Sequence, residues 1–365
     1  MAVLMYESNT TKPAVMKPAA LFLSSGDVLA DRRYERAQAY AADGDRAAAA
    51  DLLVQAVERA PGFASAWFAL GEIRAAGGDR AGAIAAFDAA RAADPSDRHG
   101  AALQLARLGA ADPAAAMTPG YLRSLFDQYA PNFDHALVAG LGYRGPVLLR
   151  EALRGVAAAR GLPFHFARAL DLGCGTGLVA EALCAHCGAI VGVDLSPAMA
   201  AAARRKNVYA DVVVADMIDF IAAQPQASCD LVTAGDALVY VADLAPVCRA
   251  VARALAPDGL FAFTVETHPG TGVVLGDKLR YAHGADHARA ALAQAGLVPL
   301  TFDDASTRTE NDIAVAGLLV IAGHDLSPKY PAALTNFRRA TAATRDRGTR
   351  SPGAGRSDRA RGCAG

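Results

Sequence analysis

Residues 169–183, ALDLGCGTGLVAEAL, decide the fold of the larger part of this chain. A short apolar run ends at Asp171, three glycines follow at alternate positions (Gly173, Gly175 and Gly177), and a helical pattern begins at once. Glycine has no Cβ, so a glycine-rich turn between a strand and a helix lets a ligand approach the main chain and the N–H groups that open the helix. We predict a ligand site at this turn.

Short apolar runs and helical stretches continue to alternate along the chain. Strands are predicted at residues 167–173, 188–195, 211–217, 229–235 and 259–266. Helices are predicted between them at residues 177–186, 196–206 and 243–256. Continuous apolar strands separated by helices predict a parallel α/β sheet covered on both faces. Ligands of such sheets bind beyond the carboxyl ends of the strands, so the polar residues at those ends are the candidates.

The residues of the glycine turn indicate what kind of ligand it takes. The dinucleotide fingerprint G-x-G-x-x-G is absent, because Leu178 stands where its third glycine would follow Gly173 and Gly175. Asp171 precedes the first glycine by two residues. A carboxylate at that point repels a pyrophosphate and attracts a cation. We therefore expect a ligand with a positive charge near the turn.

The next two predicted strands also end in carboxylates. Asp194 follows Asp171 by 23 residues, and a carboxylate there can accept both hydroxyl groups of a ribose. Asp216 and Met217 follow the third strand, where an acid can accept from an adenine amine while an apolar side chain packs on the ring. The three strand ends together predict a site for an adenine nucleoside that carries a cation.

A 34-residue repeat precedes this region. Pro61 and Pro95 are 34 residues apart and each closes a pair of helical segments. The second copy has the spacing W-x2-L-G … A-x3-F-x2-A, filled by Trp67, Leu70, Gly71, Ala83, Phe87 and Ala90. This pattern resembles the tetratricopeptide repeat, although Arg74 replaces an expected tyrosine, and residues 97–109 read as a third, truncated unit. We expect a small all-α unit over residues 28–110 that either binds a partner chain or only covers the second domain.

The motifs of the second domain resemble those of the class I S-adenosylmethionine-dependent methyltransferases. The likeness covers residues 117–323. A closer likeness is to predicted bacterial methyltransferases with an N-terminal tetratricopeptide unit, through SGDVLADRRYERAQAY, LFDQYAPNFDHALVAGLGYRGP, RYAHG and GLLVIA. The resemblance implies a Rossmann-like sheet of seven strands whose last strand is antiparallel, with residues 297–310 and 312–323 pairing as the closing hairpin.

The same resemblance implies a cofactor, S-adenosyl-L-methionine, and a methyl acceptor that the sequence does not identify. Asp171 and the three glycines would hold the methionine end, Asp194 the ribose, and Asp216 with Met217 the adenine. The full set of implied cofactor-binding residues is Asp171, Gly173, Gly175, Gly177, Asp194, Leu195, Asp216, Met217, Tyr129 and Phe133. Tyr129 and Phe133 belong to an aromatic segment, residues 121–137, which we interpret either as a lid over the cofactor or as core packing.

Candidate catalytic residues come from the ends of the fourth and fifth strands. Asp236 would either orient an acceptor or cap the next helix. Residues 267–292 form a long insertion, where Arg280, Tyr281 and His283 would bind an acidic substrate or supply a base, or where Tyr281 and His283 would only cap a helix. His268 at the exit of the fifth strand is a weaker candidate.

The composition and the charge of the chain limit the functional classes that need to be considered. The chain of 365 residues is 53% hydrophobic and 20% charged, with a net charge of -1, which is typical of a two-domain globular protein. From Lys329 onward there are nine Lys and Arg and two Asp, so the rest of the chain is acidic and no nucleic-acid partner is expected. We expect a cytoplasmic protein without a membrane span, with segments at residues 1–27, 28–110, 117–324 and a disordered basic tail at 329–365.

Three alternatives stay open. A non-enzymatic scaffold or cofactor sensor would use the repeat unit to bind a partner. A nicotinamide-dependent oxidoreductase is disfavoured by the missing fingerprint. An RNA methyltransferase is disfavoured by the acidic body and by AGDALVY at the place where an N/D-P-P-Y/F motif is expected. No metal site is expected, since Cys184 and Cys187 are the only close pair among six cysteines and read as small buried helix residues.

Overall fold

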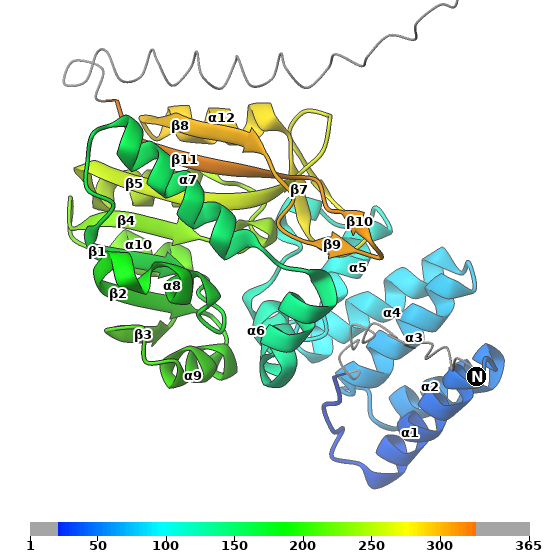
Figure 1. The fold of residues 1–365 in the computed structure, drawn as a ribbon. Helices are drawn as coiled ribbons and strands as arrows, with labels where there is room; N and C mark the ends of the chain where they lie inside the picture. The colour runs from blue at the N-terminus through cyan, green and yellow to red at the C-terminus, as the bar shows by residue number, and fades with distance from the viewer. Residues whose placement is uncertain (1–20, 326–365) are drawn as a thin grey trace, which may run out of the picture.

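The computed structural model describes residues 21–325, which form a helical unit joined to an α/β domain (Figure 1). The helical unit consists of two antiparallel helix pairs and a short fifth helix: α1 (Val28–Ala42), α2 (Arg46–Arg59), α3 (Ala64–Ala76), α4 (Arg80–Ala93) and α5 (Ala101–Arg107). The carboxylates of Asp27, Asp45 and Asp79 accept first-turn N–H groups and so begin α1, α2 and α4. This is the predicted repeat unit, with its third copy truncated.

Small residues let the helices of a pair cross closely. A Cβ added at Gly71 of α3 would lie 2.6 Å from the ring of Phe87 in α4. Both residues belong to the predicted repeat pattern, and Phe87 is 1% exposed. The repeat signature therefore marks the contact between α3 and α4.

The segment between the two units is helical but irregular. It contains the 3₁₀ turns η1 (Pro113–Ala115) and η2 (Ala130–Asn132), the helix α6 (Pro119–Tyr129) and a π-helical turn, η3 (His135–Gly140). The ring of Tyr121 packs on Gly100, where an added Cβ would be 2.6 Å away. Tyr121 also joins a cluster with Leu103 of α5 and Leu275, so the helical unit packs directly against the α/β domain.

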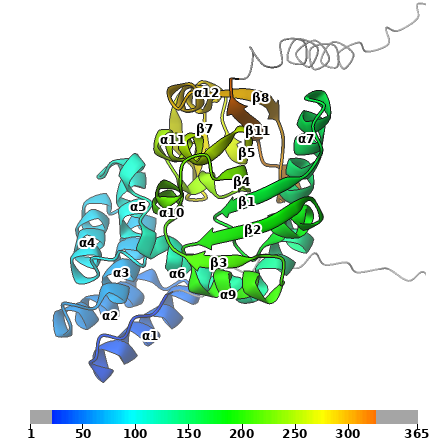
Figure 2. The ribbon, with the colours of Figure 1, turned by 90° about the vertical axis from the view of Figure 1, so that its left-hand side faces the viewer.

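The main sheet has seven strands in the order β3-β2-β1-β4-β5-β11-β8 (Figure 2). The strands are β1 (Phe166–Leu172), β2 (Cys187–Asp194), β3 (Asp211–Val214), β4 (Cys229–Ala234), β5 (Leu255–Thr267), β8 (Leu297–Asp304) and β11 (Gly317–His324). The first five pair in parallel, and β11 is antiparallel to both β5 and β8. The predicted fold class and its closing antiparallel pair are confirmed.

Two short strands were not predicted, and two others lie inside the segments expected to form the closing hairpin, residues 297–310 and 312–323. In the insertion, β6 (Val273–Leu275) and β7 (Tyr281–His283) form a hairpin, and β7 pairs in parallel with the end of β5. This pairing brings the sheet to nine strands. A separate hairpin joins β9 (Thr309–Glu310) to β10 (Ile313–Ala314). Strands of two or three residues are too short to leave a periodic pattern in a sequence.

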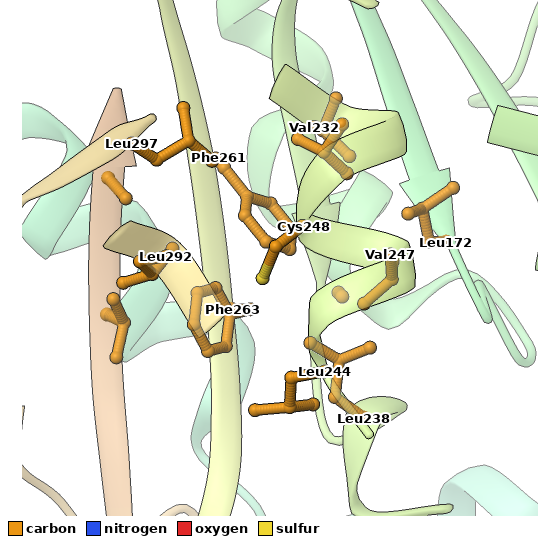
Figure 3. Close-up of a cluster of buried hydrophobic side chains, with 14 of the residues drawn as sticks. Leu172, Val232, Leu238, Leu244, Val247, Cys248, Phe261, Phe263, Leu292 and Leu297 are labelled. Atoms are coloured by element: carbon orange, nitrogen blue, oxygen red, sulfur yellow. The ribbon is translucent and has the colours of Figure 1, made fainter. Parts of the chain in front are cut away.

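Helices cover both faces of the sheet. They are α7 (Gly145–Ala159), α8 (Leu178–Leu183), α9 (Pro197–Arg205), α10 (Met217–Ala223), α11 (Ala245–Ala254) and α12 (Ala285–Gln294), with 3₁₀ turns η4 (Cys184–His186) and η5 (Leu238–Tyr240). On one face Phe261 and Phe263 of β5 pack with Val247 and Cys248 of α11 and with Leu292 of α12 (Figure 3). On the other face α7 and α8 pack on β1, β4 and β11. The sheet core fixes the strand ends at which the candidate residues lie.

Two expectations about local structure are wrong. Cys184 and Cys187 are not buried helix residues: Cys184 is exposed in η4, and Cys187 is the half-buried first residue of β2. Tyr281 and His283 do not cap α12, since they lie in β7 and the cap position is Gly284.

Within residues 21–325 there is no group of three or more His, Cys, Asp or Glu side chains that could hold a metal ion, and no helix long and apolar enough to cross a bilayer. The predicted basic tail and most of the N-terminal segment lie outside the described residues.

Candidate functional site

The glycine turn connects β1 to α8 and depends on its glycines. Gly173, Gly175 and Gly177 have φ angles of 62°, 54° and 96°, which side-chain-bearing residues rarely adopt. At Gly173 there is also no room for a side chain, because an added Cβ would be 2.6 Å from Cβ of Ala237 and 3.9 Å from the sulfur of Met217. The turn therefore lies against the chain that follows β3 and β4, as the switch-point rule predicts.

Asp171 lies beneath this turn. Its register partners are Thr233 in β4 and Gly192 in β2. Its carboxylate accepts 2.7 Å hydrogen bonds from the hydroxyls of Thr233 and Tyr209, and the residue is 1% exposed. Burial raises the pKa of Asp171 to about 6, against the effect of the two hydroxyl donors. The carboxylate thus links the end of β1 to β4 and to the loop before β3.

Asp194 joins the turn to the end of β2. Its carboxylate accepts from the N–H of Gly175 at 2.8 Å and from the N–H of Ser196 at 2.8 Å. Burial raises its pKa. An ionised carboxylate offers about four lone-pair positions, so two remain for further donors after these bonds. Leu195, half-buried, is tied to α6 because its carbonyl accepts from Nε of Arg123 at 3.3 Å.

Asp216 and Met217 begin α10 at the next strand end. The Asp216 carboxylate accepts from the N–H of Ile218 at 2.7 Å and of Asp219 at 3.3 Å, so it caps this helix. Both residues are half-buried, and the Met217 sulfur lies near the Gly173 turn. The structure thus brings the predicted residues from β1, β2 and β3 together around one turn.

The aromatic segment lies over the same place. A Cβ added at Gly175 would be 3.8 Å from the ring of Phe133, and the Phe126 ring meets Phe133 at 6.3 Å, Tyr129 at 6.5 Å and Tyr240 at 5.3 Å. All four rings are only half-buried. The segment therefore spans from the glycine turn to η5, which follows β4.

Two acids hold this segment in place. Asp127 accepts from the Ser196 hydroxyl at 2.5 Å and from the N–H of Ala198 at 3.1 Å. Asp134 accepts from the hydroxyl of Thr176, in the glycine turn itself, and pairs with Lys206 at 2.9 Å. The segment is thereby attached to the glycine turn and to the start of α9.

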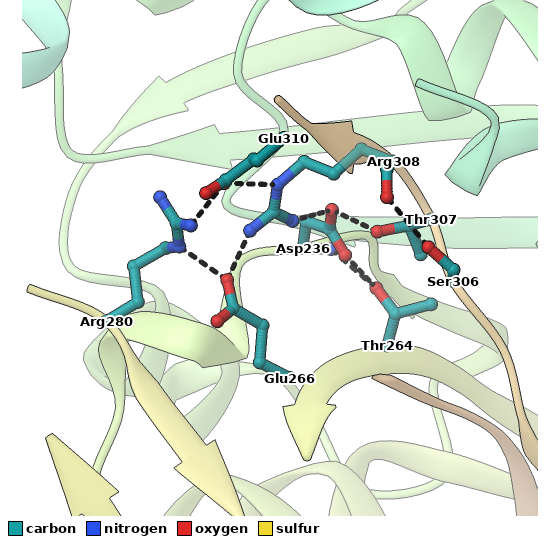
Figure 4. Close-up of polar contacts among 8 residues, drawn as sticks. All are labelled: Asp236, Thr264, Glu266, Arg280, Ser306, Thr307, Arg308 and Glu310. Carbon is teal, nitrogen blue, oxygen red and sulfur yellow. Dashed lines mark hydrogen bonds and ion pairs between the residues drawn. The ribbon is translucent and has the colours of Figure 1, made fainter. Parts of the chain in front are cut away.

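A polar network lies at the ends of β4 and β5 and includes residues of the segment before β11 (Figure 4). Asp236, after β4, accepts from the hydroxyls of Thr264 and Thr307 at 2.6 and 2.7 Å and from Arg308 at 2.8 Å. It is therefore not a helix cap. Arg308 is 5% exposed and also pairs with Glu266 and Glu310. Burial alone would lower the pKa of Arg308, but the surrounding carboxylates raise it, so the guanidinium stays charged.

The insertion contributes to this network through Arg280. Its guanidinium pairs with both Glu266 and Glu310. Tyr281 is 1% exposed and its hydroxyl donates to the carbonyl of Pro113 at 2.5 Å. His283 is 0% exposed, stacks on His287 at 5.3 Å between ring centroids, and has a pKa lowered to about 4, mainly by burial. Neither side chain reaches the surface, which disfavours both as the base.

The His268 side chain contacts the main chain of its own turn. Its Nδ1 accepts from the N–H of Gly270 at 3.2 Å, and Nε2 is 3.3 Å from the carbonyl oxygen of Gly272. Both contacts lie in the turn that leads into β6. Among the catalytic candidates predicted from the sequence, Asp236 is therefore the one that lies at a strand end next to the glycine turn.

Several residues of the site were not predicted. Tyr209 hydrogen-bonds to Asp171 from the loop before β3, and Arg308 reaches Asp236 across 72 residues. Tyr143, whose pKa burial raises well above its usual value, has its hydroxyl oxygen 3.5 Å from where a Cβ on Gly235 would be. No local pattern distinguishes these residues, because tertiary packing rather than their own segments brings them to the site.

Comparisons with known proteins agree with this architecture. Residues 170–263 match the family model described as a methyltransferase domain, and residues 40–108 match the one described as a tetratricopeptide repeat. A ubiquinone biosynthesis O-methyltransferase of Xanthomonas oryzae pv. oryzae is 35% identical over 107 residues, covering 28% of this chain and 45% of the relative. The corresponding enzyme of Xanthomonas campestris pv. campestris is 36% identical over 118 residues, covering 31% and 48%.

The chain thus spans about half the length of the curated relatives it matches. Among solved structures, an S-adenosylmethionine-dependent methyltransferase from Clostridium acetobutylicum aligns with a TM-score of 0.41 at 18% identity, covering 55% of this chain and 98% of that one.

Proposed function

Because the chain carries a methyltransferase domain behind a tetratricopeptide repeat unit, we propose that it transfers a methyl group from S-adenosyl-L-methionine to a small molecule or a protein side chain. One observation carries this proposal. Asp171, Asp194 and Asp216 lie at the ends of β1, β2 and β3, Asp194 bonds directly to the glycine turn through Gly175, and Met217 beside Asp216 lies near Gly173. Three acids favour a cationic nucleoside over a pyrophosphate.

The residues present fit that cofactor. The N–H groups and open surface of the glycine turn would face the methionine end, with Asp171 below supplying a negative field. Asp194 would accept the ribose hydroxyls through its remaining lone pairs, beside Leu195. Met217 would pack on the adenine, with Asp216 at its edge. Tyr129 and Phe133 would cover the site, and their ring faces attract a cation.

When bound, S-adenosylmethionine supplies a methyl carbon on a positively charged sulfur, open to in-line displacement. The chain's own contribution is to align the acceptor and to exclude water. Asp236 is held at the strand end next to the turn, because Thr264 donates to one of its carboxylate oxygens and Thr307 and Arg308 donate to the other. We assign it the role of orienting the acceptor group.

The test is a calorimetric titration of S-adenosylhomocysteine into wild type, Asp194→Ala and Asp219→Ala, with NAD in parallel. Asp219 is exposed in the first turn of α10 and serves as the matched control. We expect S-adenosylhomocysteine to bind wild type and Asp219→Ala, and Asp194→Ala to bind about 10-fold to 100-fold more weakly, as for the loss of hydrogen bonds to a charged group. NAD should not bind.

Either of two results would redirect the assignment. Binding of NAD but not of S-adenosylhomocysteine would point to an oxidoreductase. Tight S-adenosylhomocysteine binding without transfer of labelled methyl groups to any acceptor in a broad screen would favour the cofactor sensor. Folded wild-type protein that binds no nucleoside would overturn the proposal.

A further inference from the structure

The charged groups at the ends of β4 and β5 carry an excess of negative charge (Figure 4). Three carboxylates, those of Asp236, Glu266 and Glu310, pair with two guanidinium groups, those of Arg280 and Arg308, which leaves one negative charge in excess. We call these five side chains the charged network. Each arginine already pairs with at least two carboxylates, so neither is free to bind the acidic substrate expected from Arg280.

Asp236 is fixed in orientation and keeps one free acceptor position. Its φ is 52°, which residues with a side chain rarely adopt, and its N–H donates to the Thr264 hydroxyl at 2.8 Å. One carboxylate oxygen accepts from that same hydroxyl, and the other accepts from Thr307 and Arg308. A carboxylate offers about four lone-pair positions, so one remains on the oxygen that Thr264 contacts. Asp236 can therefore accept one further hydrogen bond.

Tyr143 brings an unused hydroxyl to the same place. The residue after it is tied to the segment that holds Asp236, since the N–H of Arg144 donates to the Thr307 carbonyl at 2.8 Å. The half-buried Tyr143 has its hydroxyl oxygen 3.5 Å from where a Cβ on Gly235 would lie. Burial raises the pKa of Tyr143 well above its ordinary value, and the Asp236 carboxylate raises it further. The phenol thus keeps its proton, and in the described part of the chain it has no hydrogen-bond partner.

A second tyrosine hydroxyl approaches the charged network from η5. Tyr240 is half-buried, with its ring 5.3 Å from that of Phe126 in the aromatic segment. Burial raises the pKa of Tyr240 to about 12, against the opposing effect of Arg280 and Arg308. Like Tyr143, it makes no hydrogen bond to any residue that the structure describes. Each phenol oxygen can accept hydrogen bonds as well as donate one, so both tyrosines have lone pairs to offer.

These groups suit a methyl acceptor that gains positive charge in the reaction. When a neutral amine attacks the methyl carbon, the N–C bond forms and the C–S bond breaks with its electron pair going to sulfur. The positive charge thereby moves to nitrogen, where the excess carboxylate and the phenol oxygens stabilise it. An alcohol or a phenol reacts after losing a proton, and a negative oxygen beside three carboxylates is disfavoured. A carboxylate acceptor is repelled for the same reason.

We propose that the acceptor is a primary amine whose nitrogen lies between Asp236 and the hydroxyls of Tyr143 and Tyr240, an assignment that rests on the proposed methyl transfer. The nitrogen of a primary amine has two N–H groups and one lone pair. One N–H matches the free position on Asp236, the other matches a phenol oxygen, and the lone pair is left to attack. An amine that arrives protonated first gives a proton to solvent, and the methylated product leaves as an ammonium ion.

The experiment compares S-adenosylhomocysteine with sinefungin, in which a carbon that bears an amino group replaces the sulfonium and its methyl. Calorimetry on the full-length chain should show that sinefungin binds about tenfold more tightly, as for a hydrogen bond to a charged group. Tyr143→Phe removes only a hydroxyl and Glu310→Gln removes the excess charge, and each should lower that ratio by about threefold or more. Asp88→Asn removes one charge from the exposed face of α4 and should leave the ratio unchanged.

The outcomes separate this proposal from the assignment of the cofactor. Thermal melts establish that each variant is folded. Wild type that binds S-adenosylhomocysteine but binds sinefungin no more tightly, or a ratio that both variants leave unchanged, would overturn the amine assignment and leave methyl transfer standing. Folded wild type that binds neither ligand would instead count against the proposed function. In an assay of labelled methyl transfer to matched primary amines, alcohols and carboxylates, a preference for either oxygen class would also overturn the amine assignment.

Discussion

The hydroxyl of Tyr209 donates a 2.7 Å hydrogen bond to the carboxylate of Asp171 beneath the glycine turn. The Tyr209 ring also lies where side chains on two glycines would be, 2.9 Å from a Cβ on Gly192 and 3.0 Å from one on Gly177. One aromatic residue therefore contacts the strand next to Asp171, the end of the turn and the acid itself. Tyr209 thus supports both the turn and the buried acid, in addition to the bonds from Thr233 to Asp171 and from Gly175 to Asp194.

The stability of the fold should depend on pH through Asp171. An unfolded aspartate titrates near pH 3.9, whereas the native pKa is about 6, so its contribution is full below about pH 3.9 and is lost as pH rises to about 6. Asp171→Asn cannot titrate. Relative to that variant, wild type should lose about 2 kcal/mol of unfolding free energy between pH 4 and pH 7. Urea denaturation of both proteins across this range measures the difference, and parallel pH curves would contradict it.

Two glycines of the turn should respond differently to alanine. Both Gly173 and Gly175 have positive φ, which costs an alanine about 1 kcal/mol. Only at Gly173 does the added Cβ meet another atom closely, at 2.6 Å from Ala237, compared with 3.8 Å from Phe133 at Gly175. Gly173→Ala should therefore lower the melting temperature more than Gly175→Ala and weaken S-adenosylhomocysteine binding more severely. Equal effects of the two substitutions would show that the strain of the positive φ, and not the contact with Ala237, causes the losses of stability and binding.

The parts of the site that could be predicted are those that a single strand and its following turn specify. The glycine turn, Asp194 and Asp216 each lie at the end of a strand of four to eight residues, which hydrophobic periodicity detects. Parallel pairing then places all of these ends at one edge of the sheet. No knowledge of strand order is needed for that step.

The parts that could not be predicted depend on strand order and on very short elements. Arg308 meets Asp236 because β11 lies next to β5, which brings the residues just before β11 to the strand ends. Tyr281 and His283 were expected to bind a substrate, to supply a base or to cap a helix, but the pairing of β7 with β5 buries them. A three-residue strand is decided by tertiary contacts rather than by its own sequence.

Arg308 should be among the most sensitive positions for stability. It is 5% exposed and paired with Asp236, Glu266 and Glu310, so its loss leaves Asp236 without a cation and leaves Glu266 and Glu310 with Arg280 alone. Arg308→Met should lower the free energy of unfolding by about 3–5 kcal/mol, as for one broken partner of a buried ion pair. Arg154→Met is the control, because its pair with Glu151 is half exposed on both sides and worth at most about 1 kcal/mol. Comparable losses for both variants in urea denaturation would refute a special role for the network.

Asp127 should determine how firmly the aromatic segment is closed. Its carboxylate accepts from the Ser196 hydroxyl and the N–H of Ala198, which attaches α6 to the start of α9 directly after Asp194 and Leu195. Asp127→Ala removes both bonds and should speed tryptic cleavage after Arg123 and dissociation of S-adenosylhomocysteine, each by about 30-fold for two lost bonds of about 1 kcal/mol. Association should change less, since the site itself is intact.

Two further variants make this prediction specific. Asp127→Asn keeps an acceptor oxygen at the same place and should restore most of the wild-type dissociation rate. Asp88→Ala removes an exposed acid from α4, far from the segment, and should change neither rate. If Asp127→Ala lowered thermal stability but left both the cleavage rate and the dissociation rate unchanged, Asp127 would be a cap of α9 only, and the aromatic segment would have to be held closed by Asp134 and its contacts to Thr176 and Lys206.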